Sequence, residues 1–191
     1  MIESEIREFA KENFVPIVRP KTKELLIEKI KEINPKNILE IGTAIGYSGI
    51  LMLLNSNANL ITLEKNENMA ELAIQNFEKE NLLNRVNLVL GDAKNYIENT
   101  KEKFDFIFLD GPKGQYLNYL PYLLKILNKN GLLFCDNVLF EGLVRSDIIA
   151  PKKHRTIVNS LRKFLSVIEN DNTLNVEVLD LEDGVALIEH K

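Results

Sequence analysis

The chain has 191 residues, of which 45% are hydrophobic and 27% charged, the composition of an ordinary globular protein with one domain. No apolar stretch approaches the roughly 18 residues of a membrane-spanning helix, so we expect no membrane partner. The formal net charge of −4 gives no general attraction to nucleic acid.

Two helices are predicted at the start of the chain, over residues 2–14 and 20–33. Pro16 and Pro20 break helical continuity, so the segment between the helices is expected to be extended. The first residues are acidic and lack the basic and apolar regions of a signal peptide, and we expect a cytoplasmic protein. The expected single domain, 1–191, thus comprises leading helices over 1–34 and a core over 35–191.

From residue 35 onward, strand-like and helix-like segments alternate. Strands are predicted at 37–41, 59–64, 86–90, 104–109 and 130–136, with helices near 46–55, 67–80, 92–99 and 115–128. This alternation is typical of right-handed βαβ units, which form a parallel sheet with helices on both faces.

The end of the chain has a different pattern. A helix over 152–169 precedes two strands, 174–179 and 185–188, which Glu182-Asp183-Gly184 joins in a tight turn. A closing hairpin makes the last strand antiparallel. The predicted fold is therefore α/β: a Rossmann-like, doubly wound, seven-stranded and mostly parallel sheet that binds ligands at the carboxyl ends of its strands.

A glycine-containing turn follows the first strand, in the segment Glu40-Ile41-Gly42-Thr43-Ala44-Ile45-Gly46-Tyr47-Ser48-Gly49. Glycine lets the backbone approach a ligand, and the start of the next helix offers free N–H groups. Ala44 and Tyr47 replace two glycines of the G-x-G-x-x-G pattern, which disfavours a pyrophosphate cofactor and a nicotinamide-dependent oxidoreductase. Ser48 either donates its hydroxyl to a carboxylate ligand or caps the helix.

Acidic residues follow the second and third strands. Glu64 comes some 22 residues after Gly42, where an acid accepts hydrogen bonds from ribose hydroxyls. Asp92, between Gly91 and Ala93, can accept a hydrogen bond from an adenine amino group. Each acid alone could instead be a helix N-terminal residue stabilised by the dipole. Together with the glycine turn, they describe an adenosine site without a pyrophosphate cradle, which fits S-adenosylmethionine.

Oxygen ligands follow the fourth and fifth strands. The apolar run 104–109 ends at Asp110, and the run 131–135 ends at Asp136-Asn137. Burial penalises a charged carboxylate, and two carboxylates with an amide oxygen at neighbouring strand ends suit Mg²⁺. Alternatively, each aspartate caps the following helix or turn. Cys135 lies inside the apolar run, so it is expected to be a buried structural thiol.

A basic segment occupies residues 151–164. It contains Lys152, Lys153, Arg155, Arg162 and Lys163, has no acidic residue, and is compatible with a polyanionic partner. A solvated helix face is the alternative interpretation.

Three motifs together resemble the metal-dependent class I O-methyltransferases, the relatives of catechol and caffeoyl-CoA O-methyltransferases. The motifs are segment 38–48, Asp110-Gly111-Pro112-Lys113-Gly114-Gln115-Tyr116, and Asp136-Asn137-Val138-Leu139-Phe140-Glu141-Gly142. Within this family, Lys113-Gly114-Gln115-Tyr116 and segment 136–144 are most similar to the bacterial tRNA 5-hydroxyuridine methyltransferases.

The resemblance implies roles for individual residues. A divalent metal, Mg²⁺ or another, would be held by Asp110, Asp136 and Asn137, and Lys113 with Asp110 would serve catalysis near the acceptor oxygen. The S-adenosylmethionine pocket would be lined by Val18, Glu40, Gly42, Ser48, Glu64, Asp92, Ala93 and Asp110. Relatives are often dimers, so a homodimer is expected.

The same resemblance implies methylation of 5-hydroxyuridine to 5-methoxyuridine at the wobble position of a tRNA anticodon loop. The alternative is a small acceptor with vicinal oxygens, such as a catechol or an acyl thioester of the caffeoyl-CoA type. The metal site alone does not distinguish the two, because both acceptors offer adjacent oxygens. A non-catalytic nucleotide-binding or RNA-binding module would not need the Asp110, Asp136 and Asn137 set.

Overall fold

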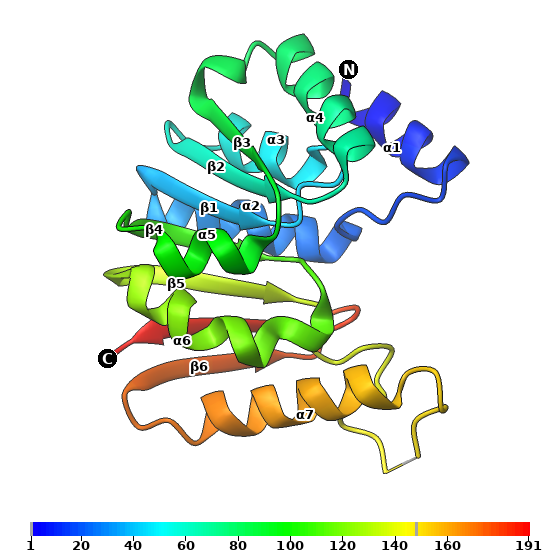
Figure 1. Ribbon diagram of the computed structural model, residues 1–191, viewed down its shortest axis with the longest axis vertical. Helices are drawn as coiled ribbons and strands as arrows, with labels where there is room; N and C mark the ends of the chain where they lie inside the picture. The colour runs from blue at the N-terminus through cyan, green and yellow to red at the C-terminus, as the bar shows by residue number, and fades with distance from the viewer. Residues whose placement is uncertain (1, 148) are drawn as a thin grey trace.

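The computed structural model describes residues 2–147 and 149–191, in which seven strands form one sheet in the order β3-β2-β1-β4-β5-β7-β6 (Figure 1). The strands are β1 (Asn37–Ile41), β2 (Asn59–Glu64), β3 (Val86–Leu90), β4 (Phe104–Leu109), β5 (Leu127–Asp136), β6 (Leu174–Leu179) and β7 (Val185–His190). The first five pair in parallel, whereas β7 runs antiparallel to both β5 and β6. The predicted doubly wound sheet with an antiparallel last strand is confirmed.

Helices cover both faces of the sheet (Figure 1). One face packs against α5 (Ala93–Asn99), α6 (Tyr116–Ile126) and α7 (Arg155–Glu169), and the other against α1 (Ile2–Glu12), α2 (Pro20–Ile33), α3 (Tyr47–Leu54) and α4 (Glu67–Lys79). Along β4, Ile107 joins the first apolar layer while Phe106 and Phe108 join the second. Because both faces are covered, β4 is a nearly continuous apolar run.

The two prolines of the N-terminal region act as expected. Pro20 is the first residue of α2, and Arg19 before it is extended, with φ −73° and ψ 160°. The first helix is shorter than the predicted 2–14, because it ends at Glu12 and Phe14 takes a left-handed φ of 53°. The connector between the helices then reaches the carboxyl edge of the sheet.

Several other boundaries differ from the expectations. Helix α6 ends at Ile126 rather than 128, β7 ends at His190 rather than 188, and the starts of β5 and α7 differ as well. Strand β5 begins at Leu127 rather than 130. The first residues of the strand resemble a turn in sequence, but an irregular pairing with β4, between Phe104 and Phe106, includes them in the strand. Asn128 there donates to Asp105 Oδ1 at 2.7 Å. Helix α7 begins at Arg155 rather than 152, because the chain from Pro151 to His154 forms a turn.

Within the described residues, no helix combines the length and the apolar character needed to cross a membrane. Cys135 is buried in the first apolar layer, and burial raises the pKa of its thiol, as expected for a structural cysteine.

Candidate active site

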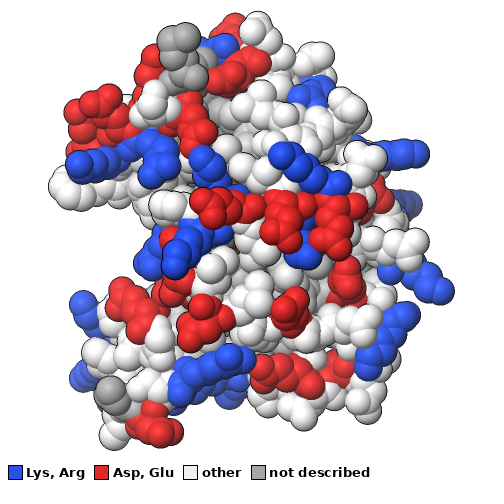
Figure 2. Space-filling model, turned by 180° about the vertical axis from the view of Figure 1, so that it is seen from behind, with Lys and Arg blue, Asp and Glu red and all other residues white. Residues whose placement is uncertain are grey.

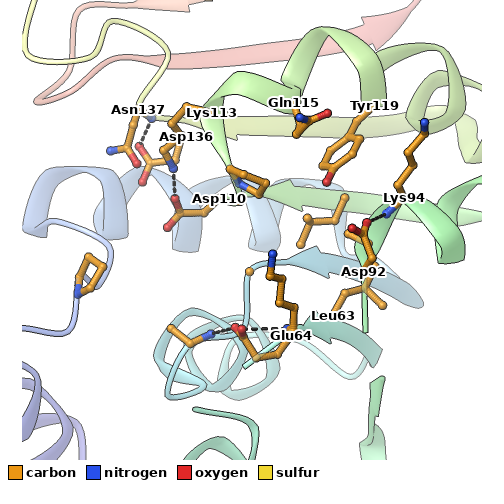
Figure 3. Close-up of a pocket in the computed structure, with 18 of the residues that line it drawn as sticks. Leu63, Glu64, Asp92, Lys94, Asp110, Lys113, Gln115, Tyr119, Asp136 and Asn137 are labelled. Carbon is orange, nitrogen blue, oxygen red and sulfur yellow. Dashed lines mark hydrogen bonds and ion pairs between the residues drawn. The ribbon is translucent and has the colours of Figure 1, made fainter. Parts of the chain in front are cut away.

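A cavity of about 910 Å³ lies at the carboxyl ends of the parallel strands (Figure 3). The order of the strands reverses between β1 and β4, and ligands of doubly wound proteins bind at such a point. The predicted site residues that line the cavity are Gly42, Glu64, Asp92, Ala93, Asp110, Lys113, Asp136 and Asn137. Its volume suits a nucleoside cofactor together with an acceptor.

Gly42 brings the ends of β1 and β4 together. Its φ is +100°, and a Cβ atom at this position would lie 2.3 Å from the carbonyl oxygen of Asp110. The Asp110 N–H in turn donates to the carbonyl oxygen of Ile41 at 3.0 Å. Only glycine fits here, and it places Asp110 directly beside the turn.

The turn after β1 also holds Glu64. The Ala44 N–H donates to Glu64 Oε2 at 2.8 Å, while the N–H groups of Lys65 and Asn66 donate to Oε1 at the same distance. Three backbone donors therefore orient a carboxylate that lines the cavity at the end of β2.

Glu40 is fully buried beneath the turn and does not line the cavity. Its carboxylate accepts hydrogen bonds from Ser48 at 2.5 Å and from Thr62 at 2.6 Å. Because the Thr62 hydroxyl proton is used in this bond, the Thr43 hydroxyl, 2.5 Å away, donates to Thr62. Burial raises the pKa of Glu40 to about 7. The network fixes the turn against β1 and β2.

Two further predicted cofactor contacts lie outside the cavity. Ser48 points to Glu40, and the interpretation as a helix cap is wrong because Gly46 occupies the N-cap position of α3. Val18 is buried, whereas its neighbours Ile17 and Arg19 line the cavity. The cofactor roles of Val18, Glu40 and Ser48 stay predictions.

Asp92 is a helix cap and also a cavity residue, and its contact with an adenine amino group stays a prediction. It is the N-cap of α5, where Oδ1 accepts the N–H of Lys94 at 2.8 Å, and its side chain also lines the cavity (Figure 3). Tyr119 lies at the same end of the cavity, and burial together with the charge of Asp92 raises the pKa of its phenol.

The expected oxygen ligands are brought together at the other end of the cavity. Leu109 pairs with Cys135, so Asp110 and Asp136 follow at adjacent strand ends, and Figure 3 shows Asn137 beside them. Asp136 is 2% exposed and accepts the Asn137 N–H at 2.7 Å. Burial and then the neighbouring charge of Asp110 raise the pKa of Asp136.

This donor set fits a divalent cation. Its oxygens are hard ligands, and the burial of Asp136 beside a second carboxylate is a cost that a cation relieves. No group of three or more histidine, cysteine, aspartate or glutamate residues suited to a metal occurs in 2–147 and 149–191, so an amide oxygen would have to complete the set.

Lys113 supplies a positive charge at this end. Its ammonium group forms an ion pair with Asp110 Oδ1 and lies 5.6 Å from the centre of the Tyr116 ring. The side chain is only 17% exposed, so the amine faces the cavity rather than bulk solvent. Lys113 is therefore not a fully exposed loop lysine.

Sequence reasoning missed four charged residues of the cavity, Arg19, Lys65, Lys94 and Asp183. Asp183 lies in the β6–β7 turn, and a signal for it was present. An antiparallel last strand beside β5 begins at the carboxyl edge, so its preceding turn must lie near the site. Arg19 had no such signal, because the connector has no regular structure.

The basic segment is only partly free for a partner. Arg162 donates to the carbonyl oxygens of Leu143, Val144 and Ser146, so its role is structural. Lys152, Lys153 and Arg155 are exposed, and the neighbouring His154 ring packs edge-on, at 5.3 Å between ring centres, against Phe140 of the cavity wall. On the face shown in Figure 2, a band of acidic side chains crosses the middle of the molecule, so that face has no continuous positive field.

Comparison with known proteins gives consistent matches. The sequence matches the family profile described as O-methyltransferase over residues 2–191. Caffeoyl-CoA O-methyltransferase 2 of Petunia hybrida is 30% identical over 171 residues, which cover 83% of this chain and 69% of the relative.

Solved structures agree over almost the whole chain. A Staphylococcus aureus protein assigned provisionally as a caffeoyl-CoA O-methyltransferase is 33% identical with a TM-score of 0.92, and the match covers 99% of this chain and 92% of that one. An O-methyltransferase from Bacillus cereus, solved in complex with SAH, is 28% identical with a TM-score of 0.86 and coverage of 99% and 90%.

Proposed function

Since the chain belongs to the O-methyltransferase family, we propose that its cavity brings S-adenosylmethionine against an acceptor hydroxyl held by a divalent cation. The protein is an S-adenosylmethionine-dependent O-methyltransferase of the caffeoyl-CoA O-methyltransferase type. The observation that carries the proposal is the shared cavity, with Glu64 and Asp92 in one part and Asp110, Asp136 and Asn137 in the other.

In this proposal the first part binds the nucleoside. Glu64 accepts hydrogen bonds from the ribose hydroxyls, because its three backbone donors already orient the carboxylate. Asp92 keeps one oxygen for the helix cap and turns the other toward the adenine amino group. The methyl group would then be presented toward the second part of the cavity, where Asp110 lies.

Asp110, Asp136 and Asn137 would hold the cation. When bound, it would polarise the acceptor oxygen and lower the pKa of the hydroxyl. The chain itself supplies alignment, since methyl transfer is an in-line displacement that depends on positioning.

Lys113 is the proposed proton acceptor. In its neutral form the amine takes the hydroxyl proton, while the acceptor oxygen attacks the methyl carbon. The carbon–sulfur bond breaks, its electron pair stays on sulfur, and S-adenosylhomocysteine leaves. A cation held by the oxygen ligands would favour the neutral amine, and Lys113 lies beside one of these ligands, Asp110.

We propose 5-hydroxyuridine at the tRNA wobble position as the acceptor. The exposed Lys152 and Lys153 precede α7 and the exposed Arg155 begins it, close to the cavity wall, and all three are suited to phosphates. An unpaired base of an anticodon loop can enter a pocket, and Phe140 offers a ring on which it can stack.

A small acceptor is the second candidate. The names of the curated relatives favour it. Of the five basic residues in the segment 151–164, Arg162 is occupied by the preceding loop, and outside the segment Arg145 pairs with Glu169 at 3.1 Å. The cytoplasmic location and the homodimer also stay predictions.

A paired substrate assay decides between these acceptors. Labelled S-adenosylmethionine is offered with tRNA carrying 5-hydroxyuridine and, separately, with catechol and caffeoyl-CoA. We expect label in the tRNA, and a loss of at least about tenfold in kcat/KM when Lys152, Lys153 and Arg155 are changed to glutamate. The control variant reverses the charge of three exposed lysines at the edge of the sheet opposite the cavity, Lys79, Lys101 and Lys129. Efficient turnover of the small acceptors without tRNA labelling would overturn the proposal.

A further inference from the structure

The loop that follows β5 carries two cavity-lining residues in a strained backbone. Asn137, Phe140 and Glu141 have left-handed φ values of 57°, 45° and 55°. Such values are uncommon for residues other than glycine, and they persist only where the surroundings hold them. Asn137 and Phe140 line the cavity, so the hold on this loop decides how the acceptor side is shaped.

The β6–β7 turn provides that hold. The Val138 N–H donates to the carbonyl oxygen of Gly184 at 3.0 Å, and the Leu139 N–H donates to that of Asp183 at 2.9 Å. Gly184 has φ +83°, and a Cβ atom there would lie 2.2 Å from Leu139 Cγ, so the loop packs directly on the turn.

Asp183 makes the contact that reaches the strained part of the loop. Its Oδ1 accepts the backbone N–H of Glu141, and the residue is 7% exposed. Its Oδ2 lies 3.9 Å from the guanidinium group of Arg19, which is half exposed and too distant for a strong ion pair. The hydrogen bond to the loop is therefore the main role of this buried carboxylate.

The neighbouring Glu182 makes a different connection. Its Oε2 accepts both the N–H and the hydroxyl of Thr22, each at 2.9 Å, at the start of α2. The side chains of two adjacent acids in one turn thus hold two different segments. Of these two side chains, that of Asp183 holds the loop with Asn137 and Phe140.

We propose that Asp183 is a positioning residue for the methyl acceptor: its carboxylate fixes loop 137–142 so that Asn137 and Phe140 face the cavity. The inference rests on the proposed function in one respect: it takes the side of the cavity lined by Asn137 and Phe140 as the side that binds the acceptor. It predicts that loss of the hydrogen bond weakens acceptor use and leaves cofactor binding unchanged.

The kinetic test compares Asp183→Ala with Asp183→Asn, which keeps an oxygen acceptor for the Glu141 N–H. For Asp183→Ala we expect kcat/KM for the acceptor to fall about 10- to 100-fold, mainly through KM, with the dissociation constant for S-adenosylhomocysteine changed less than about twofold. Asp183→Asn is expected to stay within about threefold of the wild type. Equal losses in the two variants would overturn the proposal.

A second test needs no activity. The chain has no tryptophan, so Phe140→Trp places a single fluorescent reporter on the loop. In that background we expect Asp183→Ala to increase acrylamide quenching of the reporter, and Asp183→Asn to leave it unchanged. Glu182→Ala, the control in the same turn, should lower stability without changing the quenching.

The two tests separate the possible failures. If acrylamide quenches the Phe140→Trp reporter equally with and without Asp183→Ala, the positioning role is overturned, even if the acceptor assay succeeds. If the wild type methylates no acceptor, the proposed function fails while the fluorescence result still decides the role of Asp183. If Asp183→Ala does not fold, the test uses Asp183→Asn, which keeps an oxygen acceptor for the Glu141 N–H. A marked change in quenching or in the KM for the acceptor in Asp183→Asn would then contradict the proposed role of the hydrogen bond.

Discussion

The hydroxyl oxygen of Tyr116 lies 3.0 Å from the backbone carbonyl oxygen of Asp136, in the interior of the protein. It lies at the same distance from the carbonyl oxygen of Leu109. One buried hydroxyl, on the first residue of α6, therefore faces the ends of both strands that lead into the oxygen ligands. Its single proton can serve only one carbonyl group at a time.

We expect Tyr116→Phe to lower the free energy of unfolding by about 1–2 kcal/mol, because the buried carbonyl groups lose their donor. Urea denaturation followed by circular dichroism measures this. Tyr96→Phe is the control, since the Tyr96 hydroxyl bonds to Glu102 at 3.2 Å in an exposed position, and should change stability by less than about 0.5 kcal/mol. Equal stability of the wild type and Tyr116→Phe would contradict the bridging role.

Asp136→Ala is expected to lower kcat for methyl transfer by at least about 1,000-fold, because a cation site loses a carboxylate ligand. Treatment of the wild type with EDTA should have the same effect, and added Mg²⁺ should reverse it. Cofactor binding, measured by calorimetry with S-adenosylhomocysteine, should survive both changes, since Asp136 lies at the acceptor end. Full activity of the EDTA-treated enzyme would exclude the cation site.

Much of the fold could be predicted because local and tertiary preferences agree. The apolar runs of β1, β2, β3 and β4 have the predicted bounds, since turn residues flank each run and both faces of the sheet are covered. The start of β5 was missed because Asn128-Lys129-Asn130-Gly131 has turn propensity. Pairing with β4 overrides that propensity, and no local signal reports the irregular register.

The site was predictable where a residue's role depends on its place at a strand end. Asp92, Asp110 and Asp136 follow three different strands, so topology alone brings them to one edge. Glu40 and Asp183 depend instead on contacts between segments distant in the sequence. Glu40 turns toward Ser48 and Thr62 beneath the cavity, and Asp183 reaches a loop 42 residues away.

Asp92→Asn is expected to weaken cofactor binding about tenfold while the melting temperature stays unchanged. Asparagine caps a helix as well as aspartate does, so the contact to the Lys94 N–H is kept. Its remaining N–H₂ group, however, would face the adenine amino group, donor against donor. Calorimetry with S-adenosylhomocysteine and a thermal melt give the two quantities. Asp92→Ala is the contrast, because it should lower both the affinity for S-adenosylhomocysteine and the melting temperature. Unchanged affinity in Asp92→Asn would show that Asp92 is not part of the adenosine site.

The buried Glu40 predicts a pH dependence of stability. Folding raises its pKa from an ordinary value of 4.5 to about 7, so between these values the folded protein holds a proton that the unfolded chain has lost. The contribution of Glu40 is therefore favourable below about pH 4.5, falls as the pH rises toward 7, and is constant above that. At about 1.4 kcal/mol per pKa unit, we expect Glu40→Gln to remove about 2–3 kcal/mol of the loss between pH 5 and pH 8.

The measurement is urea unfolding of the wild type and Glu40→Gln at both pH values, compared as a difference of differences. Glutamine disturbs the hydrogen bonds from Ser48 and Thr62, but that cost is the same at each pH and cancels. Asp136 contributes with the same sign, because burial raises its pKa too, so part of the slope should remain in the variant. Glu24→Gln, on the exposed side of α2, serves as the control and should follow the wild type. Parallel pH profiles for Glu40→Gln and the wild type would show that Glu40 does not bind a proton in this range.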